Sequence, residues 1–255
     1  MAEEKKMDRR ELLKGAALAG TLGVAGCGDD LSQSKVTESI LAAMEPFTYR
    51  VQRLFMSRRG LAREFEESDI TPAFKANGSV NPPDADYNAH VADNFANWRL
   101  EIGGLVAQTA SYSLAELRVM PSRTQITRHD CVEGWSCIGK WKGVQLSMLL
   151  DQAKPQPNVR FVVFHCADTL DGAKYYESID LDDAFHPQTI LAYDMNDAPL
   201  TVPHGAPIRV RLERMLGYKM AKYIMRIELV SDFKHMAGGK GGYWEDRGYA
   251  WYAGI

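Results

Sequence analysis

The residues best suited to chemistry in this sequence surround one cysteine, Cys131. It ends a strand-like stretch, follows Arg128 and His129, and precedes Gly134. Positively charged neighbours lower the pKa of a thiol and favour the thiolate, which is both a nucleophile and a soft metal ligand. A lone cysteine is more commonly buried and inert. These residues alone therefore leave a reactive and a structural cysteine both open.

The residue spacing does not favour a zinc site or a nucleotide-binding loop. The four cysteines form no C-x-x-C pair, and the six histidines lack the spacing of zinc ligands. The glycines of 238–242 do not follow the spacing of a phosphate-binding loop. A thiol-based redox protein that pairs Cys131 with Cys137 or Cys166 stays open as an alternative.

Downstream segments add aromatic, glycine and basic residues in a fixed order. They are Gly134–Ser136, Trp141–Leu150, Leu191–Leu200, His204–Arg209 and Gly217–Lys222. With the Cys131 segment they resemble the molybdopterin-binding domain of the sulfite oxidase family, which includes periplasmic methionine sulfoxide reductases. The resemblance covers about residues 71–255. It implies an oxidoreductase with a molybdenum–molybdopterin cofactor.

The resemblance also implies which residues hold the cofactor. Cys131 matches the single protein ligand to molybdenum, and a soft thiolate suits a centre that keeps other positions open for oxygen-atom transfer. The positions that match cofactor-binding residues are Asn77, Cys166, His204, Arg209, Gly217, Tyr218, Lys219 and Lys222. Within the Gly217–Lys219 loop, glycine lets backbone N–H groups approach a phosphate and lysine supplies charge.

Tyr175 is the second candidate catalytic residue. It precedes Ser178–Ile179 by the offset that the active-site tyrosine has in the sulfite-oxidising members. A phenol there would donate a hydrogen bond to a metal oxo group or an oxyanion. The alternative is a half-buried strand tyrosine, and the adjacent Tyr176 leaves the register open.

The sequence departs from the family at several positions. The sulfite-oxidising relatives have arginines where this chain has Ala76 and Ser136. Their loss weakens an anion-binding site and favours a neutral oxide over sulfite, although Lys75 and Arg128 lie nearby. Cys166 replaces a threonine of the reductase relatives, and contact with the pterin or a disulfide with Cys137 both stay open.

The hydrophobic pattern predicts an α+β fold with mixed sheets and short helices. It favours strands at 98–102, 160–167, 175–181, 189–195, 208–213 and 223–230, and helices at 113–119 and 144–153. Ser113 and Glu116 form a capping box at the start of the first helix. Proline and glycine predict a loop at 71–87. We expect a tether with a peripheral helix at 27–70 and a catalytic domain at 71–255.

Residues 1–26 predict an export signal. Asp8–Lys14 resembles a twin-arginine motif, and the apolar run Ala16–Gly26 is too short and glycine-rich to span a bilayer. Leu22–Cys27 resembles a lipobox. We therefore expect a periplasmic protein anchored to a membrane by lipid at Cys27. The twin-arginine route carries folded proteins, often with a cofactor in place, which favours an oxidoreductase.

The composition argues against a nucleic-acid partner but leaves alternative functions open. The net charge of −3 predicts no nucleic-acid partner. We expect oxygen-atom transfer with a small-molecule or side-chain substrate, and a separate electron-transfer partner such as a haem protein or membrane cytochrome. The alternatives are a sulfite dehydrogenase with an external acceptor and a cofactor-free periplasmic binding lipoprotein.

Overall fold

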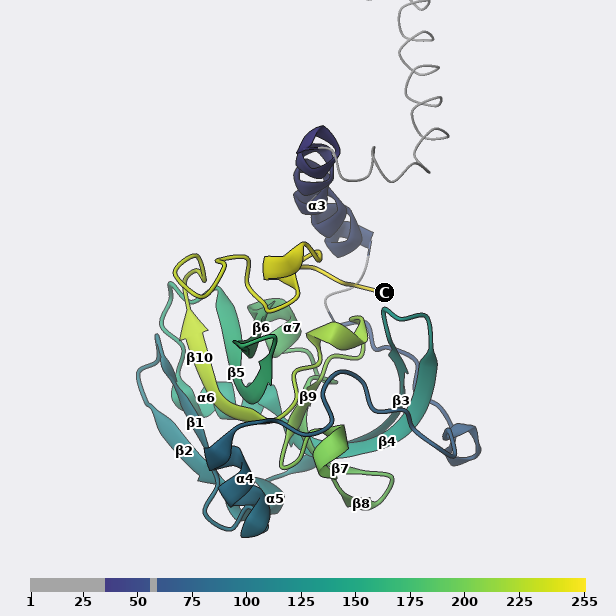
Figure 1. Cartoon of the computed structure of the whole chain (residues 1–255), viewed down its shortest axis with the longest axis vertical. Coiled ribbons are helices and arrows are strands. Elements are labelled where there is room, and N and C mark those ends of the chain that lie inside the picture. The colour runs from purple at the N-terminus through teal and green to yellow at the C-terminus, as the bar shows by residue number, and fades with distance from the viewer. Residues whose placement is uncertain (1–34, 56–58) are drawn as a thin grey trace, which may run out of the picture. The chain divides into compact units, whose positions relative to one another are not determined.

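The computed structural model describes residues 35–55 and 59–255 (Figure 1). The chain divides into two compact units, the second being Phe55–Ile255. Helix α3 spans Lys35–Phe55, within the segment predicted to hold a helix, and all but its last residue belongs to the first unit. The predicted signal and Cys27 lie outside the described residues. Across the two described ranges, no helix is both long and apolar enough to cross a bilayer.

The first sheet is mixed and carries the aliphatic core of the second unit. Its strands run in the order β2 (Ala110–Ser113), β1 (Arg99–Gly104), β10 (Ile224–Val230), β5 (Phe161–Leu170), β6 (Ala173–Asp180). The β1–β10 pair is parallel and the other pairs are antiparallel. Leu100 and Ile102 on β1 are buried and alternate with exposed Arg99 and Glu101, as the period of two predicts.

The second sheet presents the cysteine-bearing hairpin. It comprises β3 (Ser122–Asp130), β4 (Ser136–Gln145), β7 (Ile190–Met195) and β8 (Ala198–Pro199), and β9 (Arg209–Arg211) also pairs with β7. All its strand pairs are antiparallel. The β3–β4 hairpin is the longest pairing of this sheet, with Cys131 in its turn.

Short helices connect the strands. The α-helices are α4 (Ala85–Ala92), α5 (Leu114–Val119), α6 (Leu146–Ala153) and α7 (Leu181–Ala184). The 3-10 turns are η1 (Glu67–Asp69), η2 (Val202–His204), η3 (Gly217–Lys219) and η4 (Glu245–Arg247). Mixed sheets with short helices confirm the predicted α+β class.

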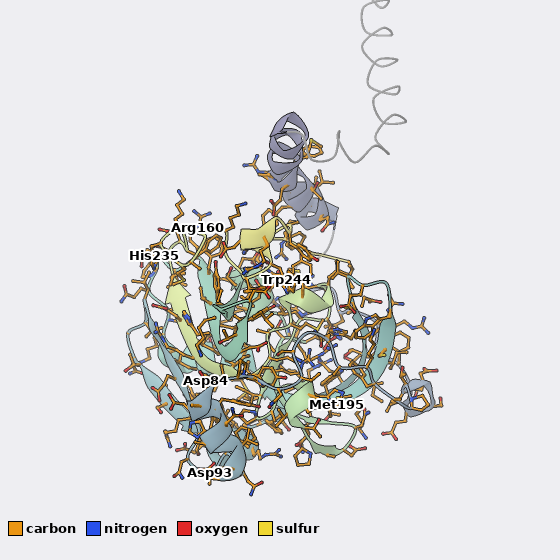
Figure 2. The ribbon with its side chains drawn as sticks, viewed as in Figure 1. Asp84, Asp93, Arg160, Met195, His235 and Trp244 are labelled. Carbon is orange, nitrogen blue, oxygen red and sulfur yellow. The ribbon has the colours of Figure 1, made fainter. Side chains whose placement is uncertain are left out.

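One core joins the two sheets, and side chains fill the space between them (Figure 2). Phe164 and Ile227 from the first sheet share it with Val144 and Leu191 from the second, and all four are fully buried. Burying such aliphatic and aromatic side chains stabilises the fold by roughly 1.5–3 kcal/mol each. This core fixes the position of the β3–β4 turn relative to β6 and β10.

The predicted elements agree with the structure in most places. The capping box at Ser113 and Glu116 is present and opens α5. The predicted loop ends earlier, because the Asp84 side chain accepts from the Tyr87 backbone N–H and starts α4 at Ala85. The predicted helix at 144–153 begins only at Leu146, since its first two residues pair in β4.

Residues 60–71 contact the sheets directly. The Phe65 N–H donates to the Ile126 carbonyl at 2.9 Å, and the Thr71 N–H donates to the Ile138 carbonyl at 3.0 Å. Gln188 is linked to Ala62 through both its amide oxygen and its amide nitrogen. This stretch therefore packs with the unit that follows it, although the sequence suggested a tether up to residue 70.

The close contact between β4 and β7 gives a stability prediction. A Cβ added at Gly143 would lie 2.1 Å from the Leu191 carbonyl oxygen, which is backbone and cannot rotate away. We expect Gly143→Ala to lower the free energy of unfolding by about 1–3 kcal/mol in urea denaturation. Gly103→Ala on β1 is the matched control, because a Cβ there meets nothing within 4 Å. Equal stability of the two variants would contradict the register of β4 against β7.

Candidate functional site

A tight turn between β3 and β4 presents Cys131. The Cys131 N–H donates to the Trp135 carbonyl at 2.9 Å, and the Gly134 N–H donates to the Cys131 carbonyl at 3.0 Å. Gly134 has φ +85°, a conformation that glycine adopts at little cost. The turn thus holds the partly exposed Cys131 thiol at the end of the hairpin.

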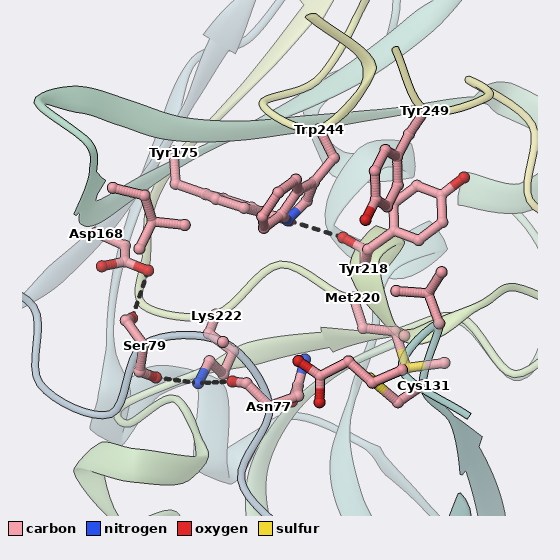
Figure 3. Close-up of a pocket in the computed structure, with 15 residues that line it drawn as sticks. Asn77, Ser79, Cys131, Asp168, Tyr175, Tyr218, Met220, Lys222, Trp244 and Tyr249 are labelled. Atoms are coloured by element: carbon pink, nitrogen blue, oxygen red, sulfur yellow. Dashed lines mark hydrogen bonds between the residues drawn. The ribbon is translucent and has the colours of Figure 1, made fainter. Parts of the chain in front are cut away.

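This thiol opens onto a pocket of about 120 Å³ (Figure 3). Its walls come from the 77–79 loop, the β3–β4 turn, the ends of β5 and β6, the η3 region and the segment around Trp244. The lining residues are Asn77, Gly78, Ser79, Cys131, Val132, Glu133, Asp168, Leu170, Tyr175, Gly217, Tyr218, Met220, Lys222, Trp244 and Tyr249. Among the predicted site residues, the pocket therefore brings together Asn77, Cys131, Tyr175, Gly217, Tyr218 and Lys222.

The basic neighbours of Cys131 do not activate it in the way the sequence suggested. Arg128 pairs with Asp130 at 2.8 Å. His129 is fully buried, and burial lowers its pKa well below the usual value, so the imidazole is neutral. Burial also raises the pKa of the Cys131 thiol. A thiolate at this position therefore needs a bound cation to stabilise it.

Arg209 is a fully buried cation on β9. Its guanidinium donates to the His204 carbonyl at 3.1 Å and to Asn77 Oδ1 at 3.5 Å, while Nε has no hydrogen-bond partner. It also lies over the Trp141 ring, 5.2 Å from the centroid. Burial and the neighbouring Arg211 lower its pKa to about 9. Within residues 59–255 no carboxylate pairs with it.

Lys222 is the second such cation. Its ammonium donates to the carbonyls of Asn77, Ser79 and Pro203 at 2.6, 2.5 and 3.0 Å. Burial, followed by repulsion from Arg209, lowers its pKa to about 7. None of its hydrogen bonds in the described part of the chain goes to a carboxylate. Buried cations without a counter-ion are costly, so an anion is the natural ligand for this corner of the pocket.

Gly205 and His204 help to position Arg209 and Lys222. Gly205 has φ +103°, and a Cβ there would lie 3.0 Å from the Lys222 side chain and 3.3 Å from Arg209 Cβ. His204 does not line the pocket; its Nε2–H donates to the Phe74 carbonyl at 3.1 Å. The predicted motif at 204–209 therefore positions Arg209, Lys222 and the loop that begins at Phe74.

Lys219 differs from the expectation that it contacts a phosphate. Its ammonium is buried between Glu177 and Glu245, with both N–O distances at 2.6 Å. Burial alone would lower its pKa, but the two carboxylates raise it above the usual value. Since its charge is already balanced, Lys219 holds the fold together while Lys222 faces the pocket.

Gly217 serves a packing role that the sequence did not indicate. A Cβ at this position would lie 2.4 Å from Cε1 and Nε2 of His129. The residue also lines the pocket. The glycine therefore lets η3 approach the strand that leads to Cys131.

Tyr175 lines the pocket, but its hydroxyl is engaged elsewhere. It donates to the Tyr218 carbonyl at 2.7 Å, and its ring stacks on Tyr243 with centroids 5.5 Å apart. Burial raises its pKa well above the usual value. The structure thus presents its ring to the pocket, and donation to an oxyanion would require this hydrogen bond to break.

Cys166 and Cys137 are free, buried thiols on different sheets, Cys166 on β5 and Cys137 on β4. Cys166 does not line the pocket. The structure therefore contains neither the disulfide between them nor a pair with Cys131 that the sequence left open.

Nine lining residues were not among the predicted site residues. They are Gly78, Ser79, Val132, Glu133, Asp168, Leu170, Met220, Trp244 and Tyr249. The Ser79 hydroxyl donates to the Asp168 carboxylate, which ties the 77–79 loop to β5. Nothing in the sequence pattern singles out Ser79 or Asp168. The aromatic density of the final residues was the one available signal for Trp244 and Tyr249.

A comparison with protein families identifies the class. Residues 88–237 match the oxidoreductase molybdopterin-binding domain. The chain therefore belongs to this family, the sulfite oxidase family of molybdopterin oxidoreductases, as its sequence motifs predicted.

Individual relatives are methionine sulfoxide reductases by name. A putative protein-methionine-sulfoxide reductase subunit of Azospira oryzae is 35% identical, over 96% of this chain and 87% of its own length. A protein-methionine-sulfoxide reductase catalytic subunit of Xanthomonas axonopodis pv. citri is 29% identical, over 90% and 72%. The Campylobacter jejuni catalytic subunit is 32% identical, over 56% and 52%. The sulfane dehydrogenase SoxCD structure from Paracoccus pantotrophus has a TM-score of 0.48 and 21% identity, over 53% of this chain and 39% of that one.

The residues at and beside the pocket fit an anionic, metal-bearing pterin. Arg209 does not line the pocket but contacts Asn77, which does. Within residues 59–255 neither Arg209 nor Lys222 has a hydrogen-bonded carboxylate, and the Arg209 Nε is buried without a hydrogen bond. In the described part of the chain, no group of three or more His, Cys, Asp or Glu side chains could hold a metal ion. The one partly exposed thiol of the pocket, Cys131, is a soft donor that suits a metal whose other sulfur ligands belong to a pterin.

The buried Lys222 predicts a pH dependence of stability. In the cofactor-free protein its pKa is about 7, below the value of 10.5 expected in the unfolded chain. Between these values the unfolded chain holds a proton that the folded chain has released, so stability increases with pH. We expect the free energy of unfolding to rise from pH 7 to pH 9, by at most about 1.4 kcal/mol per pH unit for this one proton.

Urea denaturation of Lys222→Met at pH 7, 8 and 9 tests this expectation. The variant should lose most of the slope, while Lys142→Met, which changes an exposed lysine of β4, should keep it. An unchanged slope in Lys222→Met would contradict the account of Lys222 as a buried cation without a counter-ion.

Proposed function

We propose that this protein is an exported catalytic subunit that reduces neutral sulfoxides at a mononuclear molybdenum held by Cys131. The observation that carries the proposal is the pocket itself. The partly exposed Cys131 thiol and Lys222 line one cavity, and Arg209 adjoins it. In the part of the chain that the structure describes, neither cation has a hydrogen-bonded carboxylate. The names of the Azospira and Xanthomonas relatives support a sulfoxide as the substrate.

The chain's own residues divide the work of holding the cofactor. Cys131 supplies the one protein sulfur ligand, since a thiolate is the soft donor that such a metal prefers. Arg209 and Lys222 would neutralise the anionic groups of the pterin, and Asn77, which both cations contact, would order the adjoining loop. Charge-assisted hydrogen bonds of this kind contribute about 1.5–3 kcal/mol each.

The overall reaction consumes two electrons and two protons for each sulfoxide. The S=O bond breaks, the sulfur is reduced to a sulfide, and the oxygen leaves as water. The cofactor, when bound, supplies a metal centre capable of oxygen-atom transfer. The electrons come from a separate partner, a haem protein or membrane cytochrome.

The charges around the pocket favour a neutral substrate. Sulfite is a dianion and needs fixed positive charge near the reacting centre. Lys75 lies beside Glu133 at 3.7 Å, and Arg128 is paired with Asp130. Ala76 and Ser136 stand where the sulfite-oxidising relatives have arginine. Lys75 and Arg128 are thus each already partnered by a carboxylate.

Direct comparison of substrates tests the direction of the reaction. On one molybdenum-loaded sample, sulfite-dependent reduction of an artificial acceptor is measured beside sulfoxide-dependent oxidation of a reduced viologen. We expect kcat/KM for a sulfoxide to exceed that for sulfite by about tenfold or more, since a dianion left without a cation loses several kcal/mol. If sulfite is turned over faster than every sulfoxide and N-oxide tried, the neutral-substrate proposal fails.

Substitution of the metal ligand tests the role of Cys131. Cys131→Ser should keep the melting temperature, because the change is small and the residue is partly exposed, but should lose activity and molybdenum. Cys137→Ser changes a buried thiol outside the pocket and should keep molybdenum. Full turnover by Cys131→Ser at wild-type metal occupancy would exclude the ligand role. Wild-type protein purified without molybdenum or pterin, from cells that make both, would favour the binding lipoprotein.

Export and anchoring rest on the sequence alone. We expect Arg9→Lys combined with Arg10→Lys to leave the precursor in the cytoplasm, and Cys27→Ala to release a soluble periplasmic protein. Cell fractionation and a lipid label measure both. Normal export and lipidation of the double-lysine variant would rule out the twin-arginine route.

A further inference from the structure

Residues 238–255 build one wall of the pocket. They follow the part of the chain that matches the family, residues 88–237. Trp244 and Tyr249 from this segment line the pocket opposite the 77–79 loop (Figure 3). The wall therefore lies outside the residues that the family model matches.

Buried polar contacts fix this segment in place. The Glu245 carboxylate is 1% exposed and accepts from the Lys219 ammonium at 2.6 Å. The Trp251 indole N–H donates to the Ser178 hydroxyl at 2.8 Å, and the Tyr218 hydroxyl donates to the Ala250 carbonyl at 2.7 Å. Breaking one partner of a buried ion pair is costly, so the wall is held rigidly against η3 and β6.

Aromatic rings make up most of the wall. The Trp244 and Tyr249 centroids lie 5.2 Å apart, and Tyr249 meets Tyr218 edge to face at 5.2 Å. The hydroxyls of Tyr218 and Tyr175 donate to backbone carbonyls and are not free for a ligand. The side of the pocket above Cys131 is thus lined by ring faces and edges.

Further apolar side chains line the pocket. Val132 is 48% exposed and Tyr249 is 38% exposed. Leu170 and Met220 add further apolar contacts. A ligand whose polar group approaches Cys131 would therefore place its remaining substituents among apolar and aromatic side chains.

We propose that Trp244 and Tyr249 determine specificity by binding a large apolar substituent of the sulfoxide, so that aryl and other bulky sulfoxides are preferred over dimethyl sulfoxide. This inference rests on the proposed function. Aromatic side chains bury large areas and add favourable edge and face contacts with a second ring. A rigid aromatic wall gains affinity because it loses little entropy on binding.

The test compares two neutral sulfoxides on the molybdenum-loaded enzyme with reduced viologen. For Tyr249→Ala we expect the KM for methyl phenyl sulfoxide to rise about tenfold, and the KM for dimethyl sulfoxide to change less than about twofold. Trp244→Leu should act in the same direction, and kcat should change little in either variant. Tyr249→Phe keeps the aromatic ring and should show the same preference for methyl phenyl sulfoxide as the wild type.

Phe185→Ala is the control, because Phe185 is an exposed aromatic residue outside the pocket. Its kinetics should match the wild type, and melting temperatures verify that each variant folds. A second readout without turnover is the equilibrium binding of methyl phenyl sulfone to the oxidised holoenzyme. We expect Tyr249→Ala to weaken this binding about tenfold and Tyr249→Phe to preserve it.

Two results separate the inference from the proposed function. If Tyr249→Ala changes both sulfoxides equally, or leaves both unchanged, the specificity role is wrong while sulfoxide reduction stands. If the wild type reduces neither sulfoxide yet binds the sulfone in a Tyr249-dependent way, the proposed function is wrong while the aromatic wall stands as a ligand-binding surface.

Discussion

Two buried cations constrain this site more than any other feature, and within residues 59–255 neither of them has a hydrogen-bonded carboxylate. Burial and repulsion from Arg209 lower the pKa of Lys222, whereas burial and the neighbouring Arg211 lower the pKa of Arg209. Both cations are held by neutral oxygens. Such an arrangement is unfavourable in isolation and becomes favourable when an anion binds between or beside the charges. Neighbouring residues stabilise this pair. Gly205 has no Cβ, which leaves room for the Arg209 and Lys222 side chains to pack against it, and the Trp141 ring makes a cation–π contact with Arg209.

A neighbouring lysine shows the opposite arrangement. Lys219 is only three residues from Lys222, yet it pairs with two carboxylates. Glu177 connects η3 to β6, and Glu245 connects it to the 238–255 segment. One lysine of the loop therefore secures the fold and the pocket wall, whereas the other is left for a ligand. The division also separates the two ends of the pocket, with positive charge near Asn77 and aromatic rings near Trp244.

Much of the fold and part of the site could be predicted from the sequence. Apolar alternation located the inner strands, and motif spacing located Cys131, Arg209 and Lys222, because these signals are local. The direction of the Lys219 side chain was not predictable, since it depends on Glu177 and Glu245, which are distant in sequence. Strand β4 was missed because its buried positions include small residues such as Cys137 and Gly143, which give a weak hydrophobic signal. The aromatic wall depends on how the final residues fold back, which no local pattern encodes.

Retention of the pterin by Arg209 variants tests the central claim most directly. Wild type, Arg209→Lys and Arg209→Ala are purified with cofactor, dialysed, and assayed for molybdopterin and melting temperature. The account predicts that Arg209→Ala weakens retention about tenfold to a hundredfold, the loss expected for one charge-assisted contact, with Arg209→Lys intermediate. It also predicts that the cofactor-free Arg209→Ala protein melts no lower than the cofactor-free wild type, because an unbalanced buried charge is removed. Unchanged molybdopterin content in Arg209→Ala would contradict the claim that these cations hold the cofactor.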